Sequence, residues 1–368
     1  MQISSARNYG GGEKHLIDLT RGLSERGHDV FVALRPTNDW QKRFDFLPDE
    51  NFLHVSLRNS FGVLSAQKIA EFVNEKNIDI VHAHVARDYI PASLACRLSK
   101  NAKFILTRHV LFPMKPFYKF ALGNLAKAVA VSAAVEKNLQ SLFPKNKIAL
   151  IANGIFIENQ SDESKRRLGE EFRFLHDIPF DALIVGTIGE LKILKGQRDF
   201  VLAAKIIYEK FPDARFVIVG EDHSFKKEFR QELKRLVKIF RLDKNFLFLD
   251  WVEDTAPLLA AMDVFVSPSH SESFGLAILE AMASGTAIVA AETDGANELL
   301  QNNFTGKLVP IDEPLKLAEA VAELLSDQKK RENLGANAQS SATRKFSLEK
   351  MIDETEKVYR DTLLTSQS

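Results

Sequence analysis

The feature of this sequence that most limits its fold is a regular alternation of short apolar runs with segments whose apolar residues recur at helical spacing. Chains of this kind build β-α units on a parallel sheet, because parallel strands need a crossover between them and that crossover is usually a helix. The apolar runs are residues 2–5, 30–34, 52–57, 78–83, 104–107, 129–132, 148–152, 183–188, 215–219, 245–249, 263–267, 287–291 and 307–309. The sequence therefore predicts an α/β fold with parallel sheets.

The segments between these runs have the length of helices. Gly27 and Gly285 stand where two of them would end, since glycine readily adopts the left-handed conformation that closes a helix. We predict helices at residues 13–26, 65–75, 196–210, 225–240, 274–283, 315–325, 329–343 and 348–364, and one that ends at residue 140. A polar, charged stretch at 158–173 separates two groups of runs, so we expect two α/β halves.

Composition excludes several classes of protein. Lys plus Arg and Asp plus Glu both number 49, so no global basic field points to a nucleic-acid partner. The single cysteine, Cys96, excludes an internal disulfide and a thiolate-rich metal site. No signal peptide is recognisable, and no apolar run approaches the roughly eighteen residues that span a membrane. The first apolar run is short for an interior strand, so we expect the natural chain to begin a few residues earlier.

The stretch 262–298 carries the strongest functional signal. An apolar run is followed by a polar turn, a predicted helix from about Phe274 and a second apolar run, with Glu272 before the helix and Glu280 inside it. We expect the helix's first turn to contain four residues, Ser273, Phe274, Gly275 and Leu276. Unpaired amides at the positive end of a helix dipole bind phosphate, and Glu280 would then accept from hydroxyl groups. The alternative is an amphipathic helix with one capping and one solvated glutamate.

Ligands of such sheets bind outside the carboxyl ends of the strands. That rule brings the notable polar and glycine residues to one edge of each half, and two halves whose strand ends face each other would enclose a cleft. The residues are Gly10, Gly11, Gly12, His82, His84, His109, Asn153, Lys195, Glu221, Glu272 and Glu280.

The glycine loop and two lysines are candidate phosphate contacts. Gly10–Gly12 open a predicted helix after a strand, but the loop lacks the spacing of a dinucleotide fingerprint or a P-loop, and a tight turn is the alternative. Lys195 and Lys192 lie in a loop that leads into another helix, where a solvated lysine is the alternative. No Asp-x-Asp occurs anywhere, so a bound diphosphate would be neutralised by Lys, Arg and helix amides rather than by Mg²⁺.

His82 and His84 alternate on one face of a strand end, which allows a metal site. No third ligand stands at suitable spacing, so polar lining of a cleft is the favoured interpretation. The segment 112–125 mixes aromatic residues with Lys115 and Lys119. It has two interpretations, a membrane-interface segment or a packed helix whose lysines extend to water.

Together these residues resemble glycosyltransferase family 4, which comprises retaining enzymes of the two-domain GT-B fold. The resemblance spans nearly the whole chain: GGGEKHLIDLTRGLSERGHDVFV, DIVHAH, TRHV, AVSAAVEKNL and IANGI in the first half, and VGTIGELKILKG, FVIVGE and SPSHSESFGLAILEAMASGTAIVA in the second. The last segment contains the family's Glu-x7-Glu motif as Glu272 and Glu280. The GT-B fold implies two Rossmann-like domains facing across a cleft, with the final helix crossing back to the first domain.

The resemblance implies residue roles. Glu280 would bind the ribose hydroxyls of a nucleotide, the amides at Phe274, Gly275 and Leu276 would hold the diphosphate, and Glu272 would face the donor sugar. Lys195 would neutralise the diphosphate, and His109 would lie at the reaction centre. Gly11 and Gly12 would close on the donor, and His84, Arg108 and His109 would lie on the acceptor side. Residues 1–157 with about 347–368 would form the acceptor-binding domain, and 158–346 the donor-binding domain.

The implied activity is metal-independent, retaining transfer of a sugar from a nucleotide-diphosphate sugar to a hydroxyl of a glycan or glycolipid acceptor. The protein is then expected in the cytoplasm, in peripheral contact with the membrane face. One departure is Glu190, where the family usually has an arginine that would contact the diphosphate. The alternatives are a non-catalytic nucleotide-sugar-binding relative and an epimerase of the same fold. Neither the donor base nor the acceptor follows from the sequence.

Overall fold

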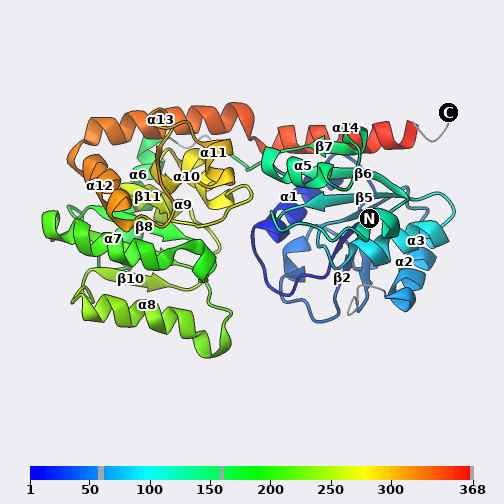
Figure 1. Ribbon diagram of the computed structural model, residues 1–368, viewed down its shortest axis with the longest axis horizontal. Coiled ribbons are helices and arrows are strands. Elements are labelled where there is room, and N and C mark those ends of the chain that lie inside the picture. Colours follow the sequence, from blue (N-terminus) through cyan, green and yellow to red (C-terminus); the bar gives the residue numbers. More distant parts are fainter. Residues whose placement is uncertain (57–61, 158–160, 365–368) are drawn as a thin grey trace. The chain divides into compact units, whose positions relative to one another are not determined.

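The computed structural model describes residues 1–56, 62–157 and 161–364 of this chain, which form two compact units. Unit 1 comprises Met1–Gly154 and Leu348–Ser368, and unit 2 comprises Ile155–Ser347. Figure 1 shows that each unit has its own sheet with helices packed against it. Leu57 and residues 158–160, which belong to predicted segments, lie outside the described residues.

Unit 1 is built on a seven-stranded parallel sheet of order β3-β2-β1-β4-β5-β6-β7. Its strands are β1 Gln2–Ser4, β2 Val32–Leu34, β3 Phe52–His54, β4 Ile80–Ala83, β5 Lys103–Arg108, β6 Leu125–Ala130 and β7 Ile148–Leu150. Its helices are α1 Gly11–Glu25, α2 Val63–Glu75, α3 Tyr89–Leu98, α4 Tyr118–Ala121, α5 Ala133–Gln140 and α14 Leu348–Leu364. The order changes direction between β1 and β4, which are hydrogen-bonded neighbours.

The last helix belongs to the core of unit 1 although it is encoded at the far end of the chain. Met351 and Ile352 of α14 are buried in one apolar cluster with Leu16 and Leu19 of α1. A Cβ atom at Gly22 would lie only 2.1 Å from the Ile352 side chain, so this glycine lets α1 and α14 approach closely. Burial against α1 therefore holds α14 on unit 1.

Unit 2 is built on a six-stranded parallel sheet of order β10-β9-β8-β11-β12-β13. Its strands are β8 Ile184–Ile188, β9 Arg215–Val219, β10 Phe246–Leu249, β11 Val264–Ser267, β12 Ala287–Ala291 and β13 Lys307–Val309. Its helices are α6 Asp162–Leu175, α7 Gln197–Lys210, α8 Glu228–Ile239, α9 Ala256–Ala261, α10 Leu276–Ser284, α11 Asp294–Leu299, α12 Pro314–Ser326 and α13 Gln328–Lys345.

Several helices differ from the sequence-based expectation. The charged stretch after residue 161, predicted to lie between the two halves, forms helix α6 of unit 2. Ser161 caps its first turn, and its surface carries ion pairs such as Arg166–Glu170 at 2.8 Å. Helix α3 was not predicted, and it carries Pro91 in its first turn, where proline is tolerated. The basic helix begins at Glu228 rather than at 225, since Lys226 and Lys227 have left-handed conformations.

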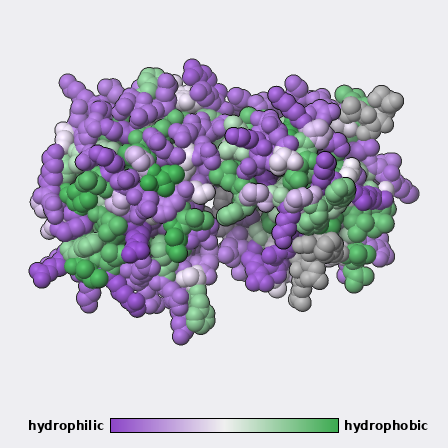
Figure 2. All heavy atoms as spheres, in the orientation of Figure 1, coloured by the Kyte–Doolittle hydropathy of each residue, from purple (hydrophilic) through white to green (hydrophobic). Residues whose placement is uncertain are grey.

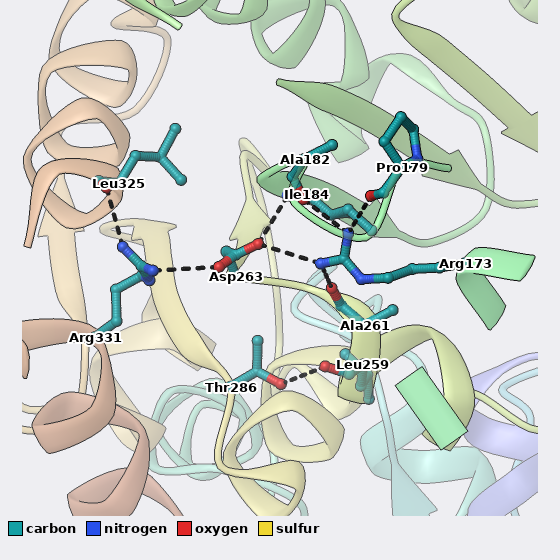
Figure 3. Close-up of polar contacts among 10 residues, drawn as sticks. All are labelled: Arg173, Pro179, Ala182, Ile184, Leu259, Ala261, Asp263, Thr286, Leu325 and Arg331. Carbon is teal, nitrogen blue, oxygen red and sulfur yellow. Dashed lines mark hydrogen bonds and ion pairs between the residues drawn. The ribbon is translucent and has the colours of Figure 1, made fainter. Parts of the chain in front are cut away.

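A largely but not fully buried ion-pair network ties the amino-terminal end of β11 to two helices of unit 2 (Figure 3). The Asp263 carboxylate accepts a 2.9 Å hydrogen bond from Ile184 N and forms ion pairs with Arg173 at 3.7 Å and Arg331 at 3.3 Å. Arg173 also donates to the Ala182 and Ala261 carbonyls. These contacts hold α6 and α13 against the end of the sheet opposite to the strand carboxyl ends.

The surface is mixed in character. Figure 2 shows polar side chains over most of the visible face, interrupted by smaller apolar areas. Among the described residues, the structure contains no helix that combines the length and the apolar character needed to cross a bilayer.

Candidate functional site

In unit 2 the strand order reverses between β8 and β11, and a parallel sheet binds ligands at such a switch point. The loop after β8 carries Lys195, and the loop after β11 carries Glu272. Their side chains meet at 2.5 Å, Nζ to Oε2, and both are mostly shielded from solvent. The structure thus places a charged pair at the position where the topology expects a ligand.

Close backbone packing fixes these two loops against each other. Gly196 adopts φ +66°, and a Cβ atom there would lie 1.9 Å from the Pro268 carbonyl oxygen, so a larger residue would force the loops apart. His270 N donates to the Leu194 carbonyl at 2.9 Å. The His270 ring also contacts Asp199 of α7, with Nε2 2.5 Å from Oδ2. The packing of these two loops therefore fixes the backbone that carries Lys195.

Helix α10 begins at Leu276, later than the sequence predicts, so Ser273, Phe274 and Gly275 precede the helix instead of forming its first turn. Gly275 at φ +98° is the N-cap and supplies no side-chain hydrogen bond. The Phe274 ring is buried against Phe346, with the ring centroids 5.9 Å apart, so only its backbone remains for a ligand. Helix α10 starts later than predicted because Gly275 has a left-handed conformation, which a helix cannot include. The first amides of α10 have no partner within the helix.

Glu280 lies in the second turn of α10, where Thr255 Oγ1 donates to its Oε2 at 3.3 Å. Glu272 precedes the same helix, and its backbone oxygen accepts from Gly295 N at 2.9 Å. The two carboxylates therefore take different surroundings: Glu272 is paired with a cation, and Glu280 has a neutral hydroxyl neighbour.

Glu190 forms an ion pair with Lys192 two residues along the same loop. Both side chains are more than two-fifths exposed. The negative charge at position 190 is thus balanced locally, and Lys195 keeps Glu272 as its partner.

In unit 1, histidines from three different elements gather beside the carboxyl ends of the strands. His82 and His84 lie on one face of β4 and the residue after it, with ring centroids 4.3 Å apart. His82 bonds to Tyr359 of α14 through Nδ1 at 2.6 Å and to Thr107 through Nε2 at 2.7 Å. His84 Nε2 bonds to the Gln2 side-chain oxygen at 2.8 Å. Both rings are buried and hydrogen-bonded to neighbouring side chains, so they do not line an open surface.

His109 follows β5 and lies between the glycine loop and the other histidines. Its Nε2 is 3.5 Å from Nδ1 of His84, and its ring is 3.9 Å from where a Gly12 Cβ would be. Gly11 and Gly12 form the first turn of α1, two residues earlier than the predicted helix start. Burial, together with the neighbouring histidines, holds the pKa of His109 well below its ordinary value, so the ring is neutral.

Arg108 is buried, and its guanidinium donates to the Phe112 carbonyl. It therefore stabilises the turn after β5 rather than extending outward.

In the same unit, Ser5 N donates to Asp88 at 2.7 Å, and burial raises the pKa of Asp88 to about 6.

The segment 112–125 is not a packed helix, because only Tyr118–Ala121 is helical. Phe112 is 67% and Phe120 81% exposed, and Lys115 and Lys119 are exposed with them. The aromatic and lysine side chains of this segment are therefore exposed rather than packed in a long helix.

Two family descriptions match the chain, one on each half. Glycosyltransferase Family 4 matches residues 9–159, and Glycosyl transferases group 1 matches residues 169–341. The chain belongs to glycosyltransferase family 4.

Relatives and a solved structure extend this result over the whole length. The N-acetyl-alpha-D-glucosaminyl L-malate synthase of Bacillus anthracis is 26% identical over 373 residues, which cover 94% of this chain and 92% of that protein. The UDP-Gal:alpha-D-GlcNAc-diphosphoundecaprenol alpha-1,3-galactosyltransferase of Escherichia coli is 27% identical over 313 residues, 79% of this chain and 77% of the relative. HepE of Anabaena, solved with UDP-glucose, has a TM-score of 0.83 at 22% identity and covers 99% of this chain and 98% of its own.

The structural likeness identifies the fold as GT-B, which confirms the prediction made from the motifs. Within this glycosyltransferase, sequence reasoning missed the neighbours of the candidate residues, namely His15, Thr255 and Tyr359, and the His270–Asp199 pair beside the Lys195 loop. His270 lies in the loop after β11, a signal that could have found it, whereas Asp199 lies in the first turn of α7. Nothing in the local sequence indicates that Tyr359 or His15 would lie near His82 and His84.

Proposed function

We propose that this glycosyltransferase moves a sugar from a nucleotide-diphosphate donor to an acceptor hydroxyl with retention of the anomeric configuration and without a metal ion. The observation that carries the proposal is the Lys195–Glu272 pair at the switch point of the second sheet, next to the start of α10. The solved HepE complex contains UDP-glucose, which supports a UDP-sugar donor.

The donor diphosphate would bind at the start of α10. The leaving diphosphate gains negative charge in the transition state, and Lys195 and the helix amides stabilise that charge without needing to move. Each charge-assisted hydrogen bond contributes roughly 1.5–3 kcal/mol. The loops around Gly196 and Pro268 fix Lys195, which lowers the cost of organising the site.

Glu280 would accept hydrogen bonds from the ribose hydroxyls, while Glu272 would orient Lys195 and contact a hydroxyl of the donor sugar. Thr255 beside Glu280 keeps that carboxylate in place. Ser273, Phe274, Gly275 and Leu276 would contribute backbone rather than side-chain contacts, since Phe274 is buried.

In unit 1, His109 would contact the transferred sugar, with Gly11 and Gly12 allowing close approach. His84 is buried and touches His109, so we assign it a positioning role. Arg108 would act in the same way, by holding the turn at Phe112. Acceptor contacts would come from residues around this turn.

The acceptor would be a glycan or glycolipid, in line with the diphosphoundecaprenol named for the Escherichia coli relative. The exposed Phe112 and Phe120, with Lys115 and Lys119, suit an anionic membrane surface, because the aromatic rings enter the headgroup layer while the lysines meet lipid charges. We therefore place the protein at the cytoplasmic membrane face. Co-sedimentation with phosphatidylglycerol vesicles tests this, and no loss of binding in the Phe112→Ser, Phe120→Ser variant would contradict it.

The donor is tested by a thermal-shift panel of UDP-, GDP- and ADP-sugars, because a ligand that binds the folded state raises the melting point. The donor that gives a shift is then incubated with an acceptor in EDTA, and the product anomer is read by NMR. Product of retained configuration at full rate in EDTA is expected. Inverted product or a requirement for metal would refute those two parts. Isomer formation without acceptor would indicate an epimerase, and no turnover of any donor would indicate a binding protein.

A further inference from the structure

The structure brings together three imidazoles that are far apart in the sequence. His15 of α1, His84 after β4 and His109 after β5 each offer a ring nitrogen, and these three nitrogens lie within 4.8 Å of one another. His82, the histidine that sequence spacing paired with His84, is instead taken up by Tyr359 and Thr107. We propose that His15, His84 and His109 form a binding site for a divalent transition-metal ion of the zinc type.

The spacing of the rings suits such an ion. In a tetrahedral site with Zn–N bonds of about 2.0–2.1 Å, two ligand nitrogens lie about 3.4 Å apart and two ring centres about 5 Å apart. The His84 Nδ1 and His109 Nε2 atoms are 3.5 Å apart. The ring centroids are 4.8 Å apart for His15–His109, 5.7 Å for His15–His84 and 5.8 Å for His84–His109.

The protonation state of His84 is fixed in the way that metal binding needs. The Gln2 side-chain oxygen can only accept, so the 2.8 Å bond places the His84 proton on Nε2. In a neutral ring the lone pair then belongs to Nδ1, which faces His109. Metal-ligating histidines usually donate their other N–H to a carbonyl or carboxylate, and Gln2 supplies such a carbonyl.

His15 gives an independent indication of a ligand. Its ring is 4% exposed, and among the described residues neither of its nitrogens has a partner at hydrogen-bond distance and angle, although the Asn153 side chain lies near enough to affect the pKa of the ring. A buried polar group without a partner costs about 1–3 kcal/mol, and a metal ion would satisfy one nitrogen. Burial holds the rings neutral, the form that ligates. His109 is only partly buried, so an ion can enter beside it.

Three protein ligands leave a fourth position for water. An ion bound to His109 would remove this side chain from the sugar-transfer centre, so we expect zinc to inhibit transfer. That consequence rests on the proposed function, whereas the binding itself does not. On binding at Nε2, the remaining proton of His109 moves to Nδ1, and no oxidation or reduction is involved.

The test is an isothermal titration calorimetry experiment in which ZnCl₂ is added to the full-length protein at pH 7.5. The His15→Leu variant removes one ligand, replaces it by a side chain of similar volume, and loses only the nearby Asn153 side chain as a polar neighbour. We expect one tight site in the wild type and at least a tenfold weaker one in this variant. His54→Asn removes an exposed histidine elsewhere in unit 1, and Asp312→Asn disrupts the Asp199–His270–Asp312 group, so both should keep wild-type affinity for this site.

Equal affinity in the wild type and the His15→Leu variant would overturn the proposal, provided that circular dichroism shows the variant folded. A second variant, Gln2→Leu, removes the partner of His84, together with the 3.1 Å bond from Gln2 Nε2 to Tyr359, and should weaken binding about 10- to 100-fold. Bound Co²⁺ should give the visible absorption of a tetrahedral site, and its absence would also overturn the proposal. If zinc binds at one equivalent and transfer continues unchanged, the metal site stands and the placement of His109 at the transfer centre is refuted.

Discussion

Lys195 and Glu272 are separated by 77 positions in the sequence, yet their side chains meet at 2.5 Å at the point where the second sheet changes direction. The pair connects the loop after β8 with the loop after β11, which are neighbours only because these strands are adjacent. Because the Lys195 ammonium group is already held at this point by Glu272, it can contact an incoming diphosphate without rearrangement of the loops. This relationship underlies the first prediction.

Lys195→Ala should lower kcat for sugar transfer by about 10²–10³, the cost of removing one preorganised donor from a developing anion. Lys192→Ala is the matched control, because Lys192 is exposed and pairs with Glu190 instead. It should change kcat less than threefold. Initial rates of nucleotide release measure both variants, and equal losses would contradict the special role of Lys195.

Glu280→Ala should weaken donor binding mainly through the ribose. A normal donor should lose about 1.5–3 kcal/mol of affinity, the value of a hydrogen bond to a charged group. A 2′-deoxyribose donor should lose much less, since it lacks one of the hydroxyls. Calorimetry of both proteins with both donors forms a double-mutant cycle, which gives the coupling energy between Glu280 and the missing ribose hydroxyl. Zero coupling with both the 2′- and 3′-deoxy donors would remove Glu280 from the ribose site.

Glu190→Gln should strengthen donor binding. The substitution removes one negative charge beside the diphosphate loop and frees Lys192, whose present partner is Glu190. Because both side chains are more than two-fifths exposed, solvent screening limits the gain to roughly 0.2–1 kcal/mol. The KM for the donor at low salt measures it, and the gain should shrink at high salt. An increased KM would show that Glu190 assists the donor.

Unit 1 should lose stability as the pH falls from about 6.5 toward 4. Burial lowers the pKa of His15 to about 4, below the value near 6.5 of an unfolded chain, so the unfolded state binds the proton first on acidification. Between pH 7.5 and 5.0 this histidine alone should cost about 2 kcal/mol. His15→Leu should remove that part of the slope. The buried Trp40 reports unfolding of unit 1 in a Trp251→Phe background, and an unchanged slope in His15→Leu would contradict the assignment.

Asp263→Ala should destabilise unit 2 by up to about 3 kcal/mol, because it leaves the largely buried ends of Arg173 and Arg331 with only carbonyl partners and no carboxylate. Asp243→Ala, at an exposed position, is the control and should change stability by no more than about 0.5 kcal/mol. Hydrogen exchange of unit 2 peptides measures both. Equal protection in the two variants would show that the network contributes nothing.

The sequence by itself determined the alternating strands and helices, and hence the α/β class, because each apolar run and each helical spacing is a local property of the chain. It also determined the positions of Glu272, Glu280 and Lys195 along the chain, since Lys195 and Glu272 lie in segments that lead from a strand into a helix and Glu280 lies inside the helix that follows. Even so, the start of α10 was predicted two residues too early, because the left-handed conformation of Gly275 depends on how the loop turns.

Only the tertiary structure decided which of these residues meet. Strand order places the β8 and β11 loops together, and a parallel sheet can be ordered in several ways by the same sequence of strands. The same holds for His15, His84 and His109, whose elements become neighbours through the packing of α1 on the first sheet. Burial then removes water from these rings and lowers their pKa values, and no local pattern in the sequence encodes that burial.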